Sequence, residues 1–402
     1  MAETVIVLQI NTTYDFGSTG RIVKSLHDSM NSLNIENYVV YARNNTIETN
    51  NIIKIKNNLY LNVFKARLFD NEGLNAENET KRLIDVIDII KPDIIHLHNI
   101  HGYYLNYELL FKYLVSKNMA VVWTLHDCWT FTGHCVYYSR VQCEKWKDHC
   151  KKCPIRKSYP KSFFFDNSYN NFEKKKSFFT YEKIRYVAVS KWLKNQAQQS
   201  FLRNNTISVI SNGIDVDFFK ATNIVDEKFK VYSNKFIILG VASEWDRRKG
   251  LDDFIELSKV LESDYIIILI GLSNRQIKNL PKNIVGLKRL DDYNELPRYY
   301  SIANVYLNLS REETMGLTTI EALSCGTPVI TYNQTAVPEN VTDEVGIVVK
   351  VGEINSIKEA INSIRKRNID KETCRTHAKE FSKEQMNRNY INLYTQIMRL
   401  EK

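Results

Sequence analysis

Two glutamates, Glu313 and Glu321, stand on either side of a glycine in the stretch SREETMGLTTIEALSCGTPVI, residues 310–330. We expect the residues NVYLNLS to form a buried strand, REETMG a loop at the carboxyl end of that strand, and LTTIEALSCG a helix that ends at Gly326. Glu313 would then project from the loop, and Glu321 would lie one to two turns into the helix.

The start of this predicted helix is suited to an anion. The amides of Met315, Gly316 and Leu317 would lack intrahelical acceptors, and the helix dipole favours negative charge there, so a phosphate fits. One carboxylate could accept hydrogen bonds from sugar hydroxyls and the other from a ribose. The alternative is a surface helix residue at 321 and a capping acid at 313.

Basic and glycine residues follow two other predicted strands. Lys249, with Arg248 beside it, follows KFIILGVA, and fixed cations there would stabilise a diphosphate that gains charge as it leaves. Gly17 to Gly20 lies between the first strand and the first helix, where backbone amides can meet a phosphate. A solvated basic turn and an ordinary strand-to-helix turn are the respective alternatives.

His126 ends the apolar run AVVWTLH, at the predicted binding edge of a sheet. A core histidine bonded to a carbonyl group is the alternative at this position. His98 and His101 could line the acceptor side, and Asp127 could orient the neighbouring loop.

Four cysteines fall within CVYYSRVQCEKWKDHCKKC, at Cys135, Cys143, Cys150 and Cys153. Four thiols that end in a C-x2-C pair can fold around one tetrahedral zinc ion, so we predict a structural zinc site. A reduced, metal-free cluster and a disulfide are the alternatives, although reduced thiols are expected in the cytosol.

Short apolar strands alternate with amphipathic helices throughout the chain, which predicts parallel sheets covered on both faces. The series restarts at KFIILGVA, so we predict two doubly wound α/β domains with a ligand cleft between them. Residues 1–210 would form the acceptor-binding domain, with a Cys-rich insertion at 128–160. Residues 211–382 would form the donor-binding domain, and 383–402 a helix that packs back towards the first.

The net charge of +9 has few obvious concentrations, apart from KDHCKKC and NFEKKKS. A solvated basic surface explains it, and attraction to an anionic membrane is the next interpretation. RGG repeats and RNP-like aromatic motifs are absent, which argues against nucleic acid. The start MAETVIVLQI reads as a strand rather than a signal peptide, so we expect a cytoplasmic protein, in contact with the inner face of the membrane.

Together these segments resemble the retaining glycosyltransferases of family 4, which have the GT-B fold. The stretch from Glu313 to Glu321 resembles the E-x7-E signature of that family. Other segments occur in the order that the family uses: GSTGRI at 17–22, PDIIHLHN at 92–99, WTLHD at 123–127, VSKWL, ISNGIDVDFF, and DRRKG at 246–250.

The resemblance implies transfer of a sugar from a nucleoside diphosphate sugar to a glycan or lipid-linked acceptor of a surface polysaccharide, with retention of configuration. It implies no catalytic metal, and no Asp-x-Asp stands at a predicted strand end. The catalytic residues it implies are His126, Glu313 and Lys249; the donor-binding residues are Gly17, Arg248, Gly286, Met315, Gly316, Leu317 and Glu321.

One position departs from the family. Many members carry an arginine six residues before the lysine, where this chain has Ser243, so Arg247 or Arg248 would supply the second cation. The base of the donor would be recognised by backbone around Val285, Gly286 and Lys288.

Two other functions share part of this pattern. A GT-B sugar-nucleotide epimerase shares the fold but seldom this order of motifs. An NAD-dependent oxidoreductase would need G-x-G-x-x-G after a strand, and the first loop reads Gly-Ser-Thr-Gly.

Overall fold

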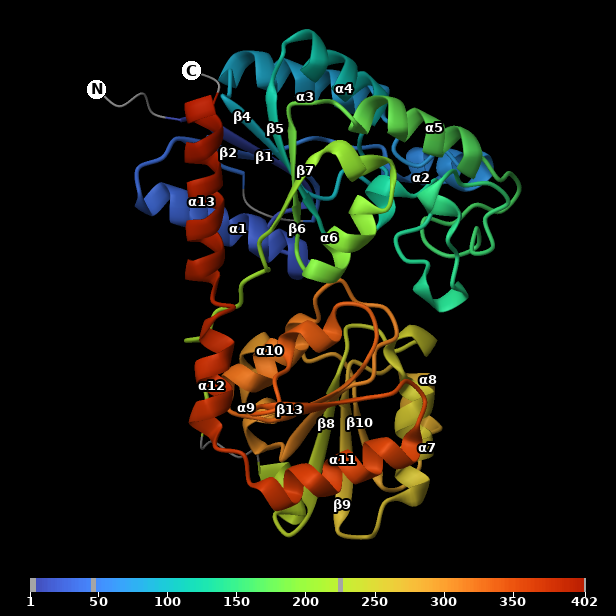
Figure 1. Cartoon of the computed structure of the whole chain (residues 1–402), viewed down its shortest axis with the longest axis vertical. Helices are drawn as coiled ribbons and strands as arrows, with labels where there is room; N and C mark the ends of the chain where they lie inside the picture. Colours follow the sequence, from blue (N-terminus) through green and yellow to red (C-terminus); the bar gives the residue numbers. More distant parts are fainter. Residues whose placement is uncertain (1–4, 45–47, 223–226, 401–402) are drawn as a thin grey trace. The chain divides into compact units, whose positions relative to one another are not determined.

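The structure is a computed structural model that describes residues 5–44, 48–222 and 227–400. The chain divides into two compact units: Met1–Ser211 together with Met386–Lys402, and Asn212–Gln385. Each unit has its own parallel sheet with helices on both faces, as the alternating pattern predicts (Figure 1).

In the described part of the first unit, seven strands pair in the order β3-β2-β1-β4-β5-β6-β7. These strands are β1 (Val7–Thr13), β2 (Asn37–Arg43), β3 (Ile52–Lys54), β4 (Ile94–Leu97), β5 (Ala120–Leu125), β6 (Ile184–Ala188) and β7 (Thr206–Val209). Its helices are α1 (Gly17–Ser32), α2 (Leu59–Phe69), α3 (Glu77–Ile90), α4 (Tyr107–Ser116), α5 (Ser168–Phe179) and α6 (Lys191–Gln198), with most of α13 (Lys383–Leu400).

In the described part of the second unit, six strands pair in the order β10-β9-β8-β11-β12-β13. They are β8 (Phe236–Val241), β9 (Tyr265–Ile270), β10 (Ile284–Leu287), β11 (Val305–Asn308), β12 (Val329–Tyr332) and β13 (Gly346–Val349). The helices are α7 (Leu251–Val260), α8 (Asn274–Lys278), α9 (Leu296–Ile302), α10 (Leu317–Ser324), α11 (Ile354–Arg367) and α12 (Lys371–Lys379).

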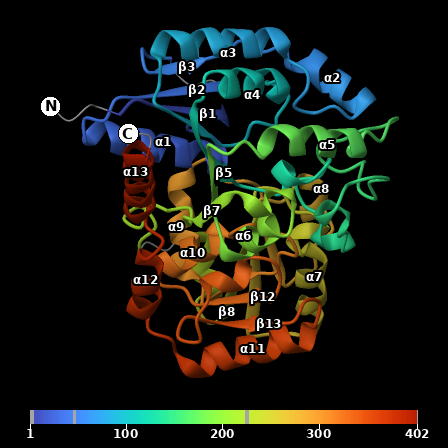
Figure 2. The same cartoon turned by 45° about the horizontal axis from the view of Figure 1, so that its top comes forward.

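The core of the first unit explains the position of α13. Leu26 and Met30 of α1 recur at helical spacing and pack with strand residues such as Val7. Tyr390 and Tyr394 of α13 join the same cluster, and α13 lies beside α1 in Figures 1 and 2. The final helix thus buries its apolar face on the first unit.

The strand orders locate the binding edges. Strand order reverses between β1 and β4 in the first sheet and between β8 and β11 in the second. Ligands of open α/β sheets bind beyond the carboxyl ends of the strands at such a switch point. No helix in the described part of the chain is long and apolar enough to cross a membrane.

Candidate active site

At the switch point of the second unit, the loops after β8 and β11 meet. Lys249, in a 3-10 turn that follows β8, forms an ion pair with Glu313, in the loop after β11. Their side chains are only 17% and 14% exposed, so the pair is shielded but still reaches the surface. The structure thus brings together two of the three residues predicted to be catalytic.

Backbone contacts hold these loops together. The amide of Arg311 donates to the carbonyl of Arg248 (2.8 Å), and the amide of Glu313 donates to Oγ1 of Thr335 (3.1 Å). Gly250 has a φ of +77°, and a Cβ there would stand 2.4 Å from the carbonyl oxygen of Leu309. Glycine is therefore required for the close approach of the two loops.

Helix α10 begins where the sequence predicts. Gly316 caps it with a φ of +81°, and its carbonyl accepts from the amide of Thr319 (3.0 Å). The side chain of Asn340 donates to the carbonyl of Met315, which is buried. The amides of Met315, Gly316 and Leu317 lie at or before the first helical residue and have no intrahelical acceptor, so they can serve as donors for an anion.

Glu321 lies inside the second unit and is not a surface residue of α10. Its side chain is buried, and Oε2 accepts from the hydroxyl of Tyr300 (2.8 Å). Burial and the neighbouring Glu321 carboxylate both raise the pKa of Tyr300, so the phenol stays protonated and donates. The sequence did not reveal this partner, because Tyr300 looks like any apolar position of α9.

The structure distinguishes the two arginines next to Lys249. The side chain of Arg247 is 86% exposed and points towards Asp252, at 4.0 Å. The side chain of Arg248 is 28% exposed, and its Nη1 donates to the carbonyl of Glu312 (3.4 Å). Only Arg248 therefore lies against the loop after β11.

The first unit places histidines at the carboxyl ends of β4 and β5. Nδ1 of His98 is 3.1 Å from Nε2 of His126, and Nε2 of His98 is 3.3 Å from Oε1 of Gln9. Gln9 is oriented with its Nε2 donating to the carbonyl of Val23 (3.4 Å). With Gln9 in this orientation, the assigned tautomers have Nε2 of His98 donating to Gln9, Nδ1 of His98 accepting from Nε2 of His126, and Nδ1 of a neutral His126 as an acceptor.

A third histidine, His96, packs its ring against that of His98, with centroids 4.0 Å apart. Nδ1 of His96 is 2.7 Å from the hydroxyl of Tyr394, and its Nε2 is 2.8 Å from Oγ1 of Thr124. Burial lowers the pKa of His126 to about 4 and that of His96 to about 3. His98, also buried, has a pKa well below its usual value. The three rings are therefore uncharged at neutral pH.

His101 and Asp127 belong to a separate contact. Nε2 of His101 is 2.8 Å from the carboxylate of Asp127, and its Nδ1 is 3.2 Å from the hydroxyl of Tyr159. Asp127 also accepts from the amide of Trp129 (2.8 Å). Although burial raises the pKa of Asp127, its contacts with His101 outweigh burial and lower the pKa overall. Asp127 thus holds the backbone of its own loop, and Tyr159 is a neighbour that the sequence did not suggest.

Two of the three glycines predicted to bind the donor, Gly17 and Gly286, differ in their surroundings. Gly17 is exposed and begins α1 with a φ of +68°, and nothing lies within 4 Å of a Cβ built there. Gly286 lies in β10, at the edge of the second sheet, where a Cβ would meet Leu280 at 2.4 Å. The positive φ explains the glycine at position 17, and close packing explains the glycine at position 286.

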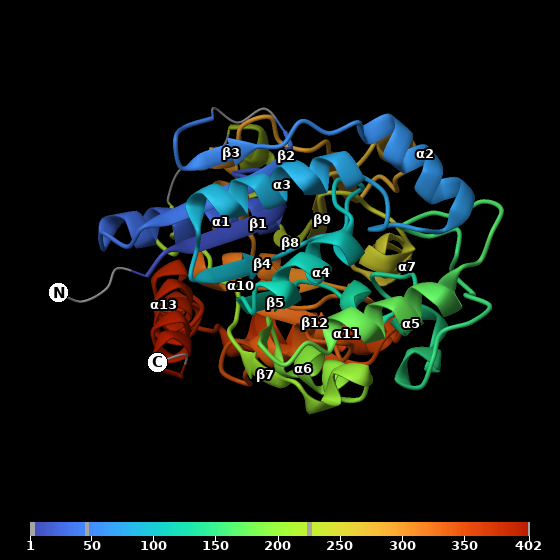
Figure 3. The same ribbon diagram turned by 90° about the horizontal axis from the view of Figure 1, so that it is seen from above.

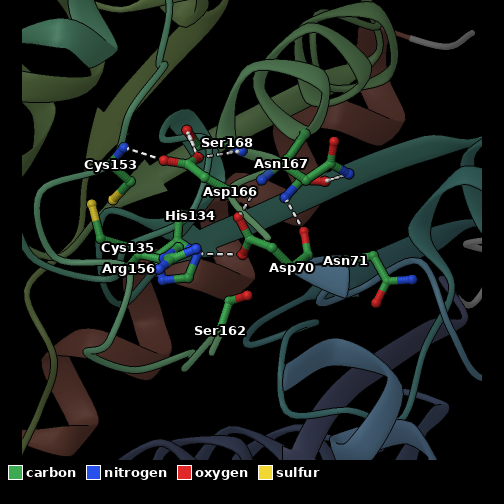
Figure 4. Close-up of polar contacts among 12 residues, drawn as sticks. Asp70, Asn71, His134, Cys135, Cys153, Arg156, Ser162, Asp166, Asn167 and Ser168 are labelled. Carbon is green, nitrogen blue, oxygen red and sulfur yellow. Dashed lines mark hydrogen bonds and ion pairs between the residues drawn. The ribbon is translucent and has the colours of Figure 1, made fainter. Parts of the chain in front are cut away.

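The predicted zinc cysteines line one small cavity together with His134. The thiols of Cys135 and Cys153 lie next to each other (Figure 4), and Sγ of Cys150 accepts from the amide of Gly133 (3.2 Å). All the cysteines are free thiols, and the described residues include no group of three or more His, Cys, Asp or Glu arranged to hold a metal ion. The zinc site stays a prediction.

The insertion around these thiols is held by a lysine. Lys175, in NFEKKKS, is buried and donates to the carbonyls of Trp129 (2.6 Å) and Thr132 (3.0 Å). Burial lowers its pKa to about 7. This residue is thus structural, whereas the sequence placed it in a solvated basic run.

Two family models match the chain. One described as Glycosyltransferase Family 4 matches residues 19–218, and one described as Glycosyl transferases group 1 matches residues 223–381. The chain therefore belongs to the group 1, family 4 glycosyltransferases, as the sequence motifs indicated.

Relatives agree with this assignment. The chain is 26% identical over 371 residues to an uncharacterised 41.2 kDa protein in the cps region of Klebsiella pneumoniae, covering 88% of this chain and 93% of that protein. It is 36% identical over 104 residues, a quarter of each chain, to the putative colanic acid biosynthesis glycosyl transferase WcaC of Escherichia coli K12.

Solved structures show the same fold. Sucrose-phosphate synthase from Thermosynechococcus elongatus matches with a TM-score of 0.71 at 16% identity, over 98% of this chain and 100% of that one. Anabaena Alr3699/HepE, solved in complex with UDP, matches with a TM-score of 0.66 at 14% identity, with the same coverage. The predicted GT-B fold, two Rossmann-like units in one chain, is confirmed.

Proposed function

We propose that the protein transfers a sugar from a nucleoside diphosphate sugar to a glycan or lipid-linked acceptor, with retention of anomeric configuration. The observation that carries the proposal is the pairing of Lys249 with Glu313 beside the start of α10, at the switch point of the second sheet. Anabaena Alr3699/HepE, which has this fold, was solved with UDP and with UDP-glucose.

The cations and amides would bind the diphosphate. Lys249 and Arg248 supply positive charge, and the turn from Met315 to Leu317 supplies amides. As the bond to the sugar breaks, charge grows on the leaving phosphate, and donors that are already in place stabilise it. The leaving phosphate oxygen would then take the proton of the acceptor hydroxyl, which attacks from the same face.

The carboxylates would bind hydroxyls. Glu313, held by Lys249, would accept from hydroxyls of the transferred sugar, and Glu321, oriented by Tyr300, from the ribose. We propose that His126 also binds the sugar. With its Nε2 donating to His98, Nδ1 of His126 would accept from a hydroxyl of the sugar.

We propose catalysis without a metal ion, because cations and amides can neutralise the diphosphate. The chain does contain one Asp-x-Asp, at 215–217, six residues beyond the end of β7. Asp215 there pairs with Lys383 and accepts from the amide of Phe218 (2.9 Å). The carboxylate of Asp215 thus binds the backbone of its own loop.

The names of the relatives support a surface polysaccharide as the product. We propose that the protein makes it at the inner face of the membrane. The test is incubation of the purified protein with UDP- and GDP-sugars and a lipid-linked acceptor extract, with EDTA present. Release of nucleoside diphosphate and a product of retained configuration by NMR are expected. Epimerised donor without transfer, or a strict need for Mn²⁺ or Mg²⁺, would contradict the proposal.

A further inference from the structure

Exposed aromatic side chains gather on two segments of the first unit. We call residues 56–69, which include α2, and residues 151–165 the aromatic–basic surface. Seven of the ten exposed Phe and Tyr side chains in the described part of the chain lie there, with Tyr60 90% and Phe164 71% exposed. The exposed apolar side chains of this surface are Tyr60, Leu61, Phe64, Phe69, Tyr159, Phe163, Phe164 and Phe165.

Direct contacts join the two segments. The amide of Phe163 donates to the carbonyl of Arg67 (2.8 Å), and the Arg67 guanidinium lies 5.8 Å from the ring centre of Phe163. The rings of Phe69 and Phe165 stack, with centroids 6.0 Å apart and an interplanar angle of 17°. Figure 3 shows α2 and the segment that leads into α5 at the same end of the first unit. They form one continuous surface.

Hydrogen bonds hold the backbone of the aromatic–basic surface in place. Asp70, which ends α2, accepts from Nδ1 of His134 (2.5 Å) and from the amide of Asn167 (2.8 Å), as Figure 4 shows. Arg156 donates to the carbonyl of Phe164 (2.6 Å). Because the backbone is held in this way, the aromatic side chains are exposed by a defined structure rather than by a loose loop.

The same surface is strongly basic, with one exposed acid, Asp166, directly after its second segment. The two segments contain eight Lys and Arg residues and neither Asp nor Glu, while the whole chain has a net charge of +9. Among the described residues, none of the eight forms an ion pair. The eight are Lys56, Lys65, Arg67, Lys151, Lys152, Arg156, Lys157 and Lys161.

We propose that the aromatic–basic surface docks the protein on an anionic lipid bilayer. The rings would enter the boundary between headgroups and acyl chains, and the cations would meet lipid phosphates. Most of the exposed apolar side chains are Phe or Leu, which gain from hydrocarbon and lack hydrogen-bonding groups. Phe69 and Phe165 already stack on each other, so that pair offers no slot for a nucleic-acid base.

Vesicle flotation with the full chain tests the proposal and needs no catalysis, so its failure would leave the proposed transferase function standing. Vesicles of phosphatidylcholine with 30% phosphatidylglycerol should bind at least ~10-fold more protein than phosphatidylcholine alone, and 500 mM NaCl should weaken binding because salt screens the charges. Equal binding to both vesicles, or none, would overturn the proposal.

Matched variants locate the surface. Phe164→Ser with Tyr60→Ser, and Lys157→Glu with Lys161→Glu, should each reduce binding at least ~10-fold. Two control variants make similar changes on the exposed side of α3: the single substitution Ile89→Ser, and the double substitution Lys81→Glu with Arg82→Glu. Neither control variant should reduce vesicle binding.

Thermal unfolding and circular dichroism confirm that each variant is folded. Control variants that lose as much binding as the surface variants would overturn the proposal. Two other results would also overturn the proposal. One is a dimer in solution that the Phe164 variant abolishes. The other is binding of a single-stranded oligonucleotide that depends on the aromatic–basic surface, without vesicle binding.

Discussion

At the carboxyl ends of β4 and β5 in the first sheet, His98 and His126 form an uncharged, hydrogen-bonded pair. At the switch point of the second sheet, Lys249 and Glu313 form an ion pair. The two sheets have equivalent strand orders, so the same architecture supports two kinds of site. Neutral rings select hydroxyls by hydrogen-bond direction, whereas fixed cations select anions. Under the proposed function, the charged site of the second unit would bind the donor diphosphate, and the neutral site of the first unit would add a contact to a sugar hydroxyl.

The largest expected effect lies in the charged site. Glu313→Gln keeps the size of the side chain but removes the charge that pairs with Lys249, and turnover should fall at least ~100-fold, about 2.7 kcal/mol. Steady-state release of nucleoside diphosphate measures this loss. Glu344→Gln, at an exposed position of the same unit, should be neutral. Unchanged turnover in folded Glu313→Gln protein would remove Glu313 from the site.

The neutral site should make the free energy of unfolding depend on pH. Because burial lowers the pKa of His126 to about 4 from 6.5, the unfolded chain binds a proton between pH 6.5 and 4 that the folded chain does not. The stability that neutral His126 contributes is complete above pH 6.5 and is lost as pH falls towards 4, at about 1.4 kcal/mol per pH unit.

Urea unfolding followed by tryptophan fluorescence reports mainly the first unit, which holds four of the five tryptophans. His126→Gln should reduce the slope of stability against pH, and His149→Gln, outside the network, should not. A slope that is the same in all three proteins would mean that His126 titrates as in water.

Sequence predicted the elements of the charged site well and its contacts poorly. The strand, loop and helix from 305 to 324 follow from an apolar run, a glycine and a second glycine at 326, which are local signals. The pairing of Lys249 with Glu313 joins residues 64 positions apart, and no local pattern encodes it. Only the family resemblance placed both in one site.

The hydrogen bonds of the histidines were even harder to predict from the sequence than the ion pair of Lys249 and Glu313. His126 was expected to be either a sugar ligand or a core histidine, and burial with a hydrogen bond to His98 gives it features of both. The contact between Tyr159 and His101 depends on the path of an insertion with little regular structure. The partnership of 56–69 with 151–165 likewise requires tertiary structure, although each basic segment can be read in the sequence.

A smaller effect should separate the two sites kinetically. His126→Asn should lower turnover about 10-fold through a lost contact to the sugar, while the affinity for nucleoside diphosphate stays unchanged. Lys249→Ala should lower both turnover and the affinity for nucleoside diphosphate, because the diphosphate is charged before and during the reaction. A His126 variant that loses nucleoside diphosphate affinity would break the assignment of roles to the two units.

The smallest effect is expected at the thiols, outside both sites. If the cysteines bind zinc, purified protein should hold about one zinc per chain, and Cys150→Ser should lose it with a regional loss of stability. Nucleoside diphosphate binding should persist while transfer falls. Cys374→Ser, a buried cysteine of the second unit, is the control. Metal-free protein with full transfer activity would identify the cluster as reduced thiols.

The central claim is that the second unit binds the donor diphosphate through Lys249 and the start of α10. Calorimetric titration of UDP and GDP into wild-type, Lys249→Ala and His126→Asn protein tests it most directly. We predict that wild-type and His126→Asn bind one of the two nucleotides equally well and that Lys249→Ala binds it at least ~10-fold more weakly. Equal binding by Lys249→Ala, or no binding of either nucleotide by the wild type, would contradict the account.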